Sequence, residues 1–477
     1  MNQLRRIVYL LVVTALFVAP GGTGRLRAQP KPNFVVVLVD DLGWMDLGCY
    51  GSKYYETPNI DRLAASGVRF TDGYAACAVC SPTRAAMMTG RYPARLGVTD
   101  WIRARFQGGA IPADGKNPSG YTGGKQKLST PRNALWMELK EVTLAEALKP
   151  AGYVSCHIGK WHLGADRWYP EKQGFDVNIG GCDYGQPPRY HFPYETPRQP
   201  SMPLLKTGQA GEYLTDREGV EAAKFIEKNK DKPFFLYLAH YAVHTPIQAK
   251  QNLKAKYDAK PKAGQKNAAY AAMIESVDDA VGRVLDKLDE LKLSEKTIIV
   301  FTSDNGGLSN VTNNAPLRAG KGFPYEGGIR VPYVVRWPGV TKAGSECHTP
   351  ISTIDVFPTV LEMAEVPLPK HEIDGVSLVD ILHGEKEFNR DGIFWHFPHY
   401  RGSIKPYGIV RAGDYKLLRY YESGTTELYN VKDDLGEAKD LVASMPGKVK
   451  QLDVMLSKWL IGVGAKMPKP NANAAAK

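Results

Sequence analysis

The chain has 477 residues, of which 43% are hydrophobic and 23% charged, an ordinary composition for a soluble globular protein. Its formal net charge is +11, with four arginines in the first 28 residues, so the remainder is mildly basic, which suits an anionic substrate. No dense Lys/Arg run with interleaved aromatic residues occurs, which argues against nucleic-acid binding. Six cysteines are too few for a disulfide framework in a chain of this length.

The N-terminal segment has the layout of a secretory signal. Arg5 and Arg6 precede an apolar run over residues 7–18, which is short for a membrane span. A small-residue region with a plausible cleavage site near Ala28 comes next,. We therefore predict a signal peptide at 1–28, export to the periplasm or out of the cell, and no stable membrane insertion after cleavage. The alternative is a retained membrane anchor.

The first predicted strand, 33–41, ends in Asp40-Asp41, and a helical segment at 59–66 comes after it. The stretch "CSPTRAAMMTGR" at 80–91 then predicts a short helix with Ser81 as N-cap, Pro82 at the first helical position and Gly90 just past its end. Cys80 would lie at the helix mouth, where backbone N–H groups favour anions, with Arg84 on the same face. Cys77 and Cys80 also form a C-x-x-C pair, which leaves a redox motif or half a zinc site as weaker alternatives.

Residues 101–135 are rich in Gly, Pro and Lys and predict a long surface insertion of the kind that often lines functional sites. A helical segment at 143–149 precedes a second buried strand within 152–164, which ends in Lys160 and His162. Residues 183–211 resemble the first insertion in composition.

A helix at 214–229 leads to a third strand within 232–246, which ends in His244. A long helix at about 268–291 precedes the fourth strand, within 296–307, which ends in Asp304-Asn305. All four strands are continuous apolar runs, as in parallel sheets covered on both faces. The alternation predicts an α/β fold, a layered α/β/α domain with a mainly parallel central sheet.

Beyond about residue 385 the pattern changes to short strand-like pieces separated by turns, with a helix near 447–460. We predict three units after the signal peptide: a catalytic domain at 29–384, a smaller α+β subdomain with an antiparallel sheet at 385–467, and a disordered tail at 468–477.

Polar chemistry comes after all four predicted strands. In open α/β sheets, sites form outside the carboxyl ends of the strands, so these groups should converge. Three carboxylates and an amide, from Asp40, Asp41, Asp304 and Asn305, make an oxygen-rich set that favours Ca²⁺ or Mg²⁺ over zinc. Lys160, His162, His244 and Lys321, the last in a glycine-rich loop, are further candidates. Each group taken alone could be a structural cap, turn or surface residue.

The stretch at 80–91 resembles the C-x-P-x-R…TGR signature of type I sulfatases, the family that includes arylsulfatases and N-acetylgalactosamine sulfatases. "GKWHLG" at 159–164 and the Lys321 loop resemble further blocks of that family. The resemblance covers roughly residues 33–339, and "STIDVFPTVLEMAEV" with "ELYNVKDDLGEAKDL" is similar to its later segments. It implies an alkaline-phosphatase-like catalytic domain and hydrolysis of sulfate esters.

The resemblance also implies site roles. A separate maturing enzyme would oxidise Cys80 to formylglycine (3-oxoalanine), whose hydrate attacks sulfur and forms a covalent sulfo-enzyme. One Ca²⁺ would be held by residue 80 with the oxygen set at 40, 41, 304 and 305, and Arg84 would stabilise the hydrate. Lys160 and Lys321 would clamp the sulfate oxygens. His162 would take the proton when the sulfo-enzyme collapses, and His244, with Lys321, would assist the leaving alcohol.

Two other functions stay open at this point. A phosphatase or phosphonate monoester hydrolase of the same superfamily would need two metals and several metal-binding histidines. An exported, non-catalytic glycan-binding protein would result if Cys80 were never oxidised. Export and many aromatic residues favour a carbohydrate sulfate of the galactose or N-acetylgalactosamine type as substrate. The predicted substrate contacts are Arg189, Tyr190, His191, His396 and His399.

Overall fold

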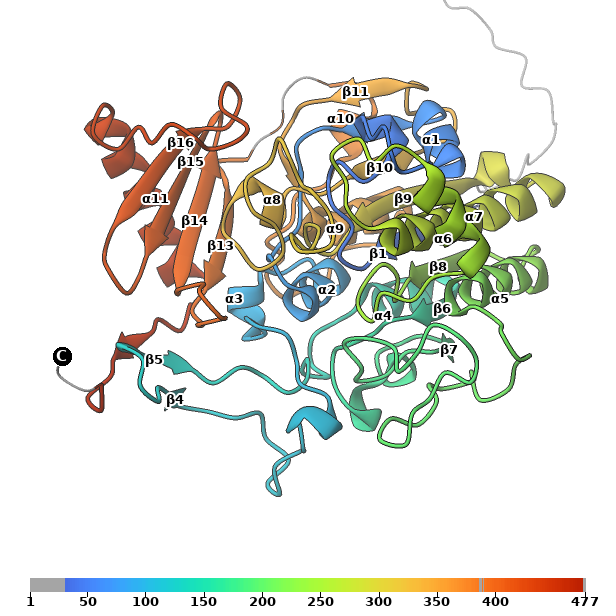
Figure 1. Ribbon diagram of the computed structural model, residues 1–477, viewed down its shortest axis with the longest axis horizontal. Helices are drawn as coiled ribbons and strands as arrows, with labels where there is room; N and C mark the ends of the chain where they lie inside the picture. The colour runs from blue at the N-terminus through green and yellow to red at the C-terminus, as the bar shows by residue number, and fades with distance from the viewer. Residues whose placement is uncertain (1–30, 386–387, 389, 475–477) are drawn as a thin grey trace, which may run out of the picture. The chain divides into compact units, whose positions relative to one another are not determined.

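The computed structural model describes residues 31–385, 388 and 390–474, so the predicted signal peptide lies outside the described residues. From Pro32 onward the chain forms one compact unit. Its centre is an eight-stranded sheet with the order β11-β2-β10-β9-β1-β8-β6-β7 (Figure 1). The strands are β1 (Asn33–Val39), β2 (Val68–Phe70), β6 (Val154–Gly159), β7 (Val177–Ile179), β8 (Phe234–Ala239), β9 (Thr297–Ser303), β10 (Tyr333–Arg336) and β11 (Ser345–Cys347).

Five consecutive strands, β9, β1, β8, β6 and β7, are parallel, as the apolar sequences of the predicted strands indicate. β1 pairs in parallel with β8 on one side and β9 on the other, and β6 pairs in parallel with β8 and β7. β10 runs antiparallel to both β9 and β2. All seven residues of β1 are buried, because both faces of the sheet are covered. The four predicted strands and the mainly parallel sheet are confirmed.

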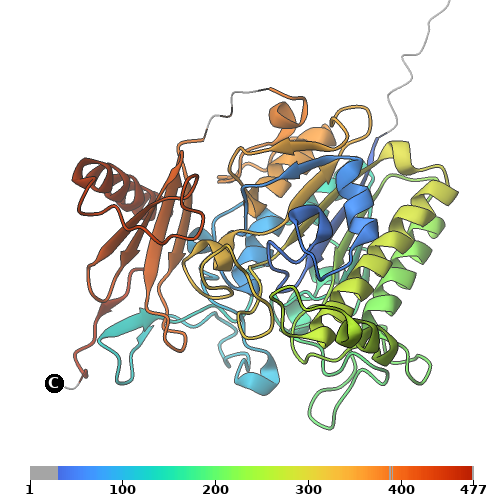
Figure 2. The ribbon, with the colours of Figure 1, turned by 45° about the horizontal axis from the view of Figure 1, so that its top comes forward.

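Alternate residues of β1 enter two different cores. Val35 and Val37 pack with helices α1 (Pro58–Ala65), α5 (Leu214–Lys228) and α7 (Ala268–Glu290). Phe34 and Val36 pack with α2 (Cys80–Thr89), α4 (Leu144–Leu148) and α9 (Val356–Met363) on the other face. Figure 2 shows α5 and α7 side by side, next to α6 (Gln251–Ala259). The layered α/β/α architecture is therefore confirmed.

Helix α2 differs in one detail from the prediction. It begins at Cys80, with Val79 in the N-cap position, so Ser81 is not the cap. The Ser81 hydroxyl instead donates to the carbonyl of His162 at 3.0 Å and accepts from the amide of Ile102 at 2.9 Å. Gly90 ends the helix in the left-handed conformation, with φ of 68°, as predicted. The hydroxyl thus ties the helix start to two loops of the site.

A second, four-stranded antiparallel sheet lies in the C-terminal part, as predicted. Its order is β13-β14-β15-β16, with helix α11 against it (Figure 1). These elements are β13 (Ile393–Phe397), β14 (Tyr407–Ala412), β15 (Tyr415–Tyr420), β16 (Thr426–Asn430) and α11 (Pro446–Gly462). The remaining short elements are α3 (Pro93–Leu96), α8 (Glu326–Ile329), α10 (Val379–Leu382), β3 (Gly73–Tyr74) and β12 (Ile351–Ser352).

Part of the segment 468–477, which we predicted to be disordered, forms a strand; residues 475–477 lie outside the described residues. Lys469 and Pro470 form strand β17 (Lys469–Pro470), which pairs antiparallel with β5 (Leu128–Pro131). β5 also pairs with β4 (Tyr121–Thr122), so the 101–135 insertion contains a small sheet that the end of the chain completes. Pairing with a distant edge strand is a tertiary effect that local composition does not report.

Candidate functional site

The carboxyl ends of β1 and its neighbours meet at one edge of the sheet. Because β1 lies between β8 and β9 in parallel register, the residues after these strands are adjacent. The amide of Asp40 donates to the carbonyl of Ala242 at 2.9 Å, and the amide of Asp304 donates to that of Val39 at 3.2 Å. The Ser303 hydroxyl donates to the Val39 carbonyl at 3.0 Å and accepts from the amide of Leu42 at 3.0 Å. The predicted convergence of strand ends is thus present.

Cations and carboxylates alternate at this edge. Lys160 Nζ lies 2.6 Å from Asp40 Oδ2, and Lys321 Nζ lies 2.5 Å from Asp41 Oδ1. The amide nitrogen of Asn305 donates to Asp41 Oδ1 at 2.8 Å. All five side chains are buried, so each charge depends on its neighbours rather than on water for stabilisation.

Arg84 completes this network from helix α2. Its Nε donates to Asp304 Oδ2 at 2.9 Å, and its Nη1 donates to the carbonyl of Lys160 at 2.8 Å. Its Nη2 lies 2.8 Å from Asp304 Oδ2 and 3.7 Å from Asp40 Oδ1. Arg84 therefore links the helix that carries Cys80 to the ends of β1, β6 and β9.

The pKa values of the two neighbouring carboxyl groups, Asp40 and Asp41, are shifted in opposite directions. Burial raises the pKa of Asp40 well above its usual range, and the charges of Asp304 and Asp41 add to this against the opposing effect of Lys160. Burial would also raise the pKa of Asp41, but Lys321 and His244 outweigh it and hold that pKa below its usual range. Repulsion among buried carboxylates is relieved when a cation lies between them.

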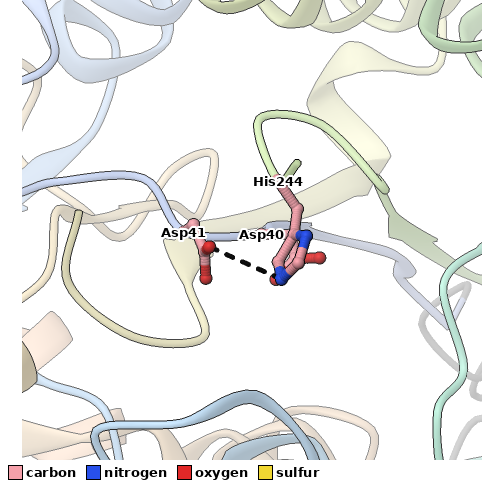
Figure 3. Close-up of side chains that lie close together, drawn as sticks. All are labelled: Asp40, Asp41 and His244. Atoms are coloured by element: carbon pink, nitrogen blue, oxygen red, sulfur yellow. Dashed lines mark ion pairs between the residues drawn. The ribbon is translucent and has the colours of Figure 1, made fainter. Parts of the chain in front are cut away.

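The donor set fits a hard metal ion. Asp40 Oδ1 and Asn305 Oδ1 are buried and have no hydrogen-bond partner among the described residues, which leaves two oxygens free to act as ligands. Ligand atoms of Asp40, Cys80 and Asp304 lie within 4.8 Å of one another, and so do those of Asp40, Asp41 and His244 (Figure 3). Carboxylate and amide oxygens are the ligands that Ca²⁺ and Mg²⁺ take.

Cys80 lies directly against this oxygen set. Its side chain belongs to the group formed with Asp40 and Asp304, and only 4% of the residue is exposed. None of the six cysteines, all within the part of the chain that the structure describes, forms a disulfide. Cys77 and Cys80 are therefore unpaired in this structure.

His162 is held with one nitrogen free. Its Nε2 lies 2.6 Å from the carbonyl of Ile102; a carbonyl only accepts, so Nε2 carries the hydrogen and Nδ1 carries the lone pair. Nδ1 is buried and has no hydrogen-bond partner among the described residues. Burial, together with Lys160 and Arg84, lowers the pKa of His162 well below its usual range. The ring is a neutral base with an available lone pair.

His244 has the opposite tautomer. Its Nδ1 lies 2.9 Å from the carbonyl of Thr245, so Nε2 is the bare nitrogen, and it lies 3.6 Å from Asp41 Oδ2, the pair marked in Figure 3. Burial and Lys321 lower the pKa of His244 to about 3. The hydroxyl of Tyr190 donates to the carbonyl of His244 at 2.9 Å, which fixes the loop after β8.

The predicted substrate contacts lie outside this cluster. Tyr190 is fully buried and supports the His244 loop, and Arg189 is exposed. His191 packs on the ring of Tyr213. His396 is buried, with Nδ1 bonded to the Tyr421 hydroxyl and Nε2 to the carbonyl of Lys466.

His396 therefore has no ring nitrogen left for a substrate, and we no longer assign it a contact. His399 is buried, with Nε2 2.8 Å from the Thr99 hydroxyl, in the wall of a neighbouring cleft.

The sequence alone did not reveal Arg401, whose Nη1 is buried without a hydrogen-bond partner among the described residues. Nothing in its local sequence distinguishes it from a surface arginine.

Comparisons with known proteins agree with this geometry. The Sulfatase family model matches residues 32–366, and a model described as N-sulphoglucosamine sulphohydrolase, C-terminal, matches residues 319–463. A sulfatase of Formosa agariphila is 32% identical, over 100% of this chain and 99% of that protein. Arylsulfatase A of Homo sapiens is 31% identical, over 90% and 87%.

N-acetylgalactosamine-6-sulfatase of Canis lupus familiaris is 35% identical, over 84% of this chain and 74% of that protein. Among solved structures, Ps i-CgsB superposes with a TM-score of 0.74 at 32% identity and covers 90% of this chain and 92% of its own. With a family model that spans most of the chain and relatives of this identity and coverage, the chain belongs to the sulfatase family and is a sulfuric ester hydrolase.

Proposed function

We propose that this sulfatase releases sulfate from sulfated carbohydrates of the galactose or N-acetylgalactosamine type, with residue 80 as formylglycine and one Ca²⁺ at the strand ends. The observation that carries the proposal is the position of Cys80. Its sulfur lies at the start of a buried helix and within 4.8 Å of carboxylate oxygens from two strand ends. A nucleophile made from this residue would have both a cation site and Arg84 beside it.

The modification and the metal supply distinct chemistry. When formed, formylglycine supplies, as its hydrate, an oxygen nucleophile whose sulfate ester can break down to the aldehyde, which a plain serine ester cannot do. When bound, Ca²⁺ supplies positive charge at the carboxylates and lowers the energy of negative charge at the reaction centre. The ligands we assign are residue 80 and Asp40, Asp41, Asp304 and Asn305.

The chain's own cations would bind the sulfate group. Lys160 and Lys321 each neutralise one carboxylate in the structure, and both ammonium groups have further N–H donors for sulfate oxygens. Arg84 is held rigidly by Asp304 and the carbonyl of Lys160. Donors fixed in a buried site stabilise developing charge without reorganising during the reaction.

Two histidines divide the proton transfers. His162 Nδ1 has a lone pair and no partner among the described residues, so we assign it as the base that accepts a proton when the sulfate ester on residue 80 breaks down. His244 is neutral in the substrate-free protein because its pKa is lowered to about 3. An anionic sulfate would raise that pKa, so binding of substrate would itself equip His244, with Lys321, to assist the leaving alcohol.

The substrate class is supported by two of the similar proteins. One of them is an N-acetylgalactosamine-6-sulfatase. Ps i-CgsB has been solved in complex with k-i-k-neocarrahexaose, again with 32% identity to this chain. Both names point to sulfated sugars of the galacto series, and this chain shares most of its fold with them rather than the catalytic motif alone.

Maturation and export form part of the proposal. Every residue of α2 is buried, so a maturing enzyme could reach Cys80 only before the chain folds. We assign residues 1–28 as the signal peptide that delivers the protein to the periplasm or the exterior. In the part of the chain that the structure describes, no helix combines the length and hydrophobicity needed to cross a bilayer.

Mass spectrometry of the tryptic peptide "FTDGYAACAVCSPTR" (70–84) tests the modification directly. Protein made together with a maturing enzyme should show this peptide lighter by about 18 mass units, mapped to residue 80, and should hydrolyse sulfated monosaccharides. Cys80→Ala, made in parallel, should show neither. An unmodified Cys80 in protein that still releases sulfate would overturn the formylglycine assignment, and turnover of aryl sulfates alone would overturn the substrate class.

A further inference from the structure

A cleft of about 660 Å³ lies between the 101–135 insertion and the segment after β13. This volume is within the range of small-molecule binding sites in proteins. The side chains that matter for its chemistry are those of Trp101, Arg103, Arg132, Asn133, His399 and Tyr400. The insertion is anchored across the cleft, because the amide of Leu128 donates to the Tyr400 hydroxyl at 3.2 Å.

One wall of the cleft is continuous with the catalytic residues. Ile102 is fully buried; its carbonyl accepts from His162 and its amide donates to Ser81, next to Cys80. The residues on either side of it, Trp101 and Arg103, line the cleft. A single extended stretch therefore holds the catalytic base on one side and presents an aromatic ring and a guanidinium on the other.

The opposite wall reaches the sulfate-binding loop. His399 and Tyr400 line the cleft, and the next residue, Arg401, packs against Gly322, where an added Cβ would lie 3.4 Å from Arg401 Nε. Gly322 comes directly after Lys321. The buried Nη1 of Arg401 has no hydrogen-bond partner among the described residues. Each wall is thus joined to a loop of the strand-end site through one neighbouring residue, Ile102 on one side and Arg401 on the other.

Two arginines, Arg103 and Arg132, and one acid, Asp100, line the cleft, so positive charge is in excess there. Arg103 and Arg132 are exposed, and neither forms an ion pair with any residue that the structure describes. The guanidinium of Arg103 lies over the ring of Trp101, 5.7 Å from its centroid. Burial of the neighbouring Asp100 raises its pKa to about 6, against the opposing charges of Arg401 and Arg103, so its own charge is partly withdrawn in weakly acidic solution.

Resting on the proposed function, we propose that this cleft binds the sugar next to the one that carries the scissile sulfate, and that Arg103 and Arg132 bind a second anionic group on it. The ligand class is an oligosaccharide with a further sulfate or carboxylate. Trp101 offers an aromatic face for a sugar ring, and arginine forms paired hydrogen bonds with planar or tetrahedral oxyanions. A lone sulfated monosaccharide fills only the catalytic part of the site.

The experiment measures kcat/KM of matured enzyme with Ca²⁺ on three substrates: an aryl sulfate, a monosulfated disaccharide, and the same disaccharide with a second sulfate on the neighbouring sugar. The wild type should prefer the disulfated disaccharide. Arg103→Ala combined with Arg132→Ala should lower kcat/KM for that substrate by about ten- to a hundredfold, as expected for loss of hydrogen bonds to a charged group, and leave aryl sulfate turnover unchanged.

Arg198→Ala is the matched control, since Arg198 is also exposed and lies outside the cleft. Trp101→Ala should lower kcat/KM for both disaccharides alike, because it removes stacking and no charge. Equal losses on all substrates with a lowered unfolding temperature would mean general damage and overturn the assignment, as would an unaffected preference for the disulfated substrate. If the matured wild type hydrolyses no sulfate ester at all, the proposed function fails instead, a distinguishable result.

Discussion

Two groups of buried charge in this chain look alike in composition but differ in how their atoms are satisfied. The strand-end site holds three acids, two lysines and Arg84. The second group, here called the C-terminal charge cluster, lies where the antiparallel sheet meets the 73–74 and 326–330 segments. It consists of Asp72, Glu326, Arg330, Arg411, Lys416 and Glu437.

In the C-terminal charge cluster every carboxylate oxygen has a partner. Lys416 Nζ lies 3.0 Å from Glu326 Oε1 and 2.8 Å from Glu437 Oε1. Glu437 Oε2 accepts from the amide of Glu326, and Glu326 Oε2 from the hydroxyl of Tyr74. Arg330 and Arg411 cover the two oxygens of Asp72. Arg411 Nε is left without an acceptor among the described residues.

In the strand-end site, in contrast, several hydrogen-bond acceptors have no donor among the described residues. Asp40 Oδ1, Asn305 Oδ1 and His162 Nδ1 are all buried without hydrogen-bond partners among the described residues. A buried acceptor without a donor costs free energy, so its retention points to a ligand. What distinguishes the strand-end site from the C-terminal charge cluster is therefore not buried charge but several free acceptor atoms gathered in one place.

A matched pair of lysine substitutions should give the largest difference between the two clusters. Lys416→Met leaves Glu326 and Glu437 buried without their cation and should lower the free energy of unfolding by about 3–5 kcal/mol, while the folded fraction keeps its activity. Lys160→Met should lower kcat/KM by about a thousandfold with a smaller loss of stability, because Arg84 remains beside Asp40. Denaturant unfolding and sulfate release, measured on both variants, separate the two effects; the reverse pattern would show that the clusters have been assigned the wrong way round.

Calcium binding should distinguish the two clusters by a smaller difference in the free energy of unfolding. Only the site with free oxygens should bind it, so Ca²⁺ at a hundredfold excess over its dissociation constant should stabilise the wild type by about 2.7 kcal/mol. Asn305→Ala should reduce this gain, whereas Glu326→Gln, less stable at the outset, should keep it. Thermal unfolding with and without chelator gives the measurement, and a gain that survives in Asn305→Ala but not in Glu326→Gln would contradict the site assignment.

The last prediction concerns acid stability. Burial lowers the pKa of His396 to about 4, while the unfolded chain protonates histidine near its ordinary pKa of 6.5. Between these values the unfolded state binds a proton that the folded state does not, so stability falls as pH falls from 6.5 to 4. His396→Gln should reduce that slope by about 1.4 kcal/mol per pH unit. Unfolding free energies at about pH 7, 5.5 and 4 test this, and parallel curves for the two proteins would refute it.

The strand-end site was predictable from sequence because its signals are local. An apolar run that ends in Asp40-Asp41 or Asp304-Asn305 encodes both the strand and the polar groups at its carboxyl end. The parallel arrangement then brings the strand ends together without further information. Even there, the helix start was misplaced by two residues, since Ser81 bonds to the loops of Ile102 and His162 rather than capping its own helix.

The substrate side was less predictable because its contacts join distant segments. His396 and His399 look alike in sequence. Both ring nitrogens of His396 are hydrogen-bonded, to Tyr421 and to Lys466, whereas His399 forms part of a cleft wall. Only its packing on Gly322, next to Lys321, places Arg401 near the strand-end site. The pairing of Lys469 with Ser129 likewise has no local signature.

The pairing of Lys469 with Ser129 has a consequence for how the cleft is held. Asn471 Nδ2 also donates to the carbonyl of Gln126 at 2.7 Å, so the C-terminal strand fastens the 101–135 insertion, which forms one wall of the cleft. Proteolytic removal of the residues after Met467 would therefore leave an enzyme that hydrolyses simple sulfate esters but discriminates poorly among glycans. Preparations of this protein should be checked for an intact C-terminal strand.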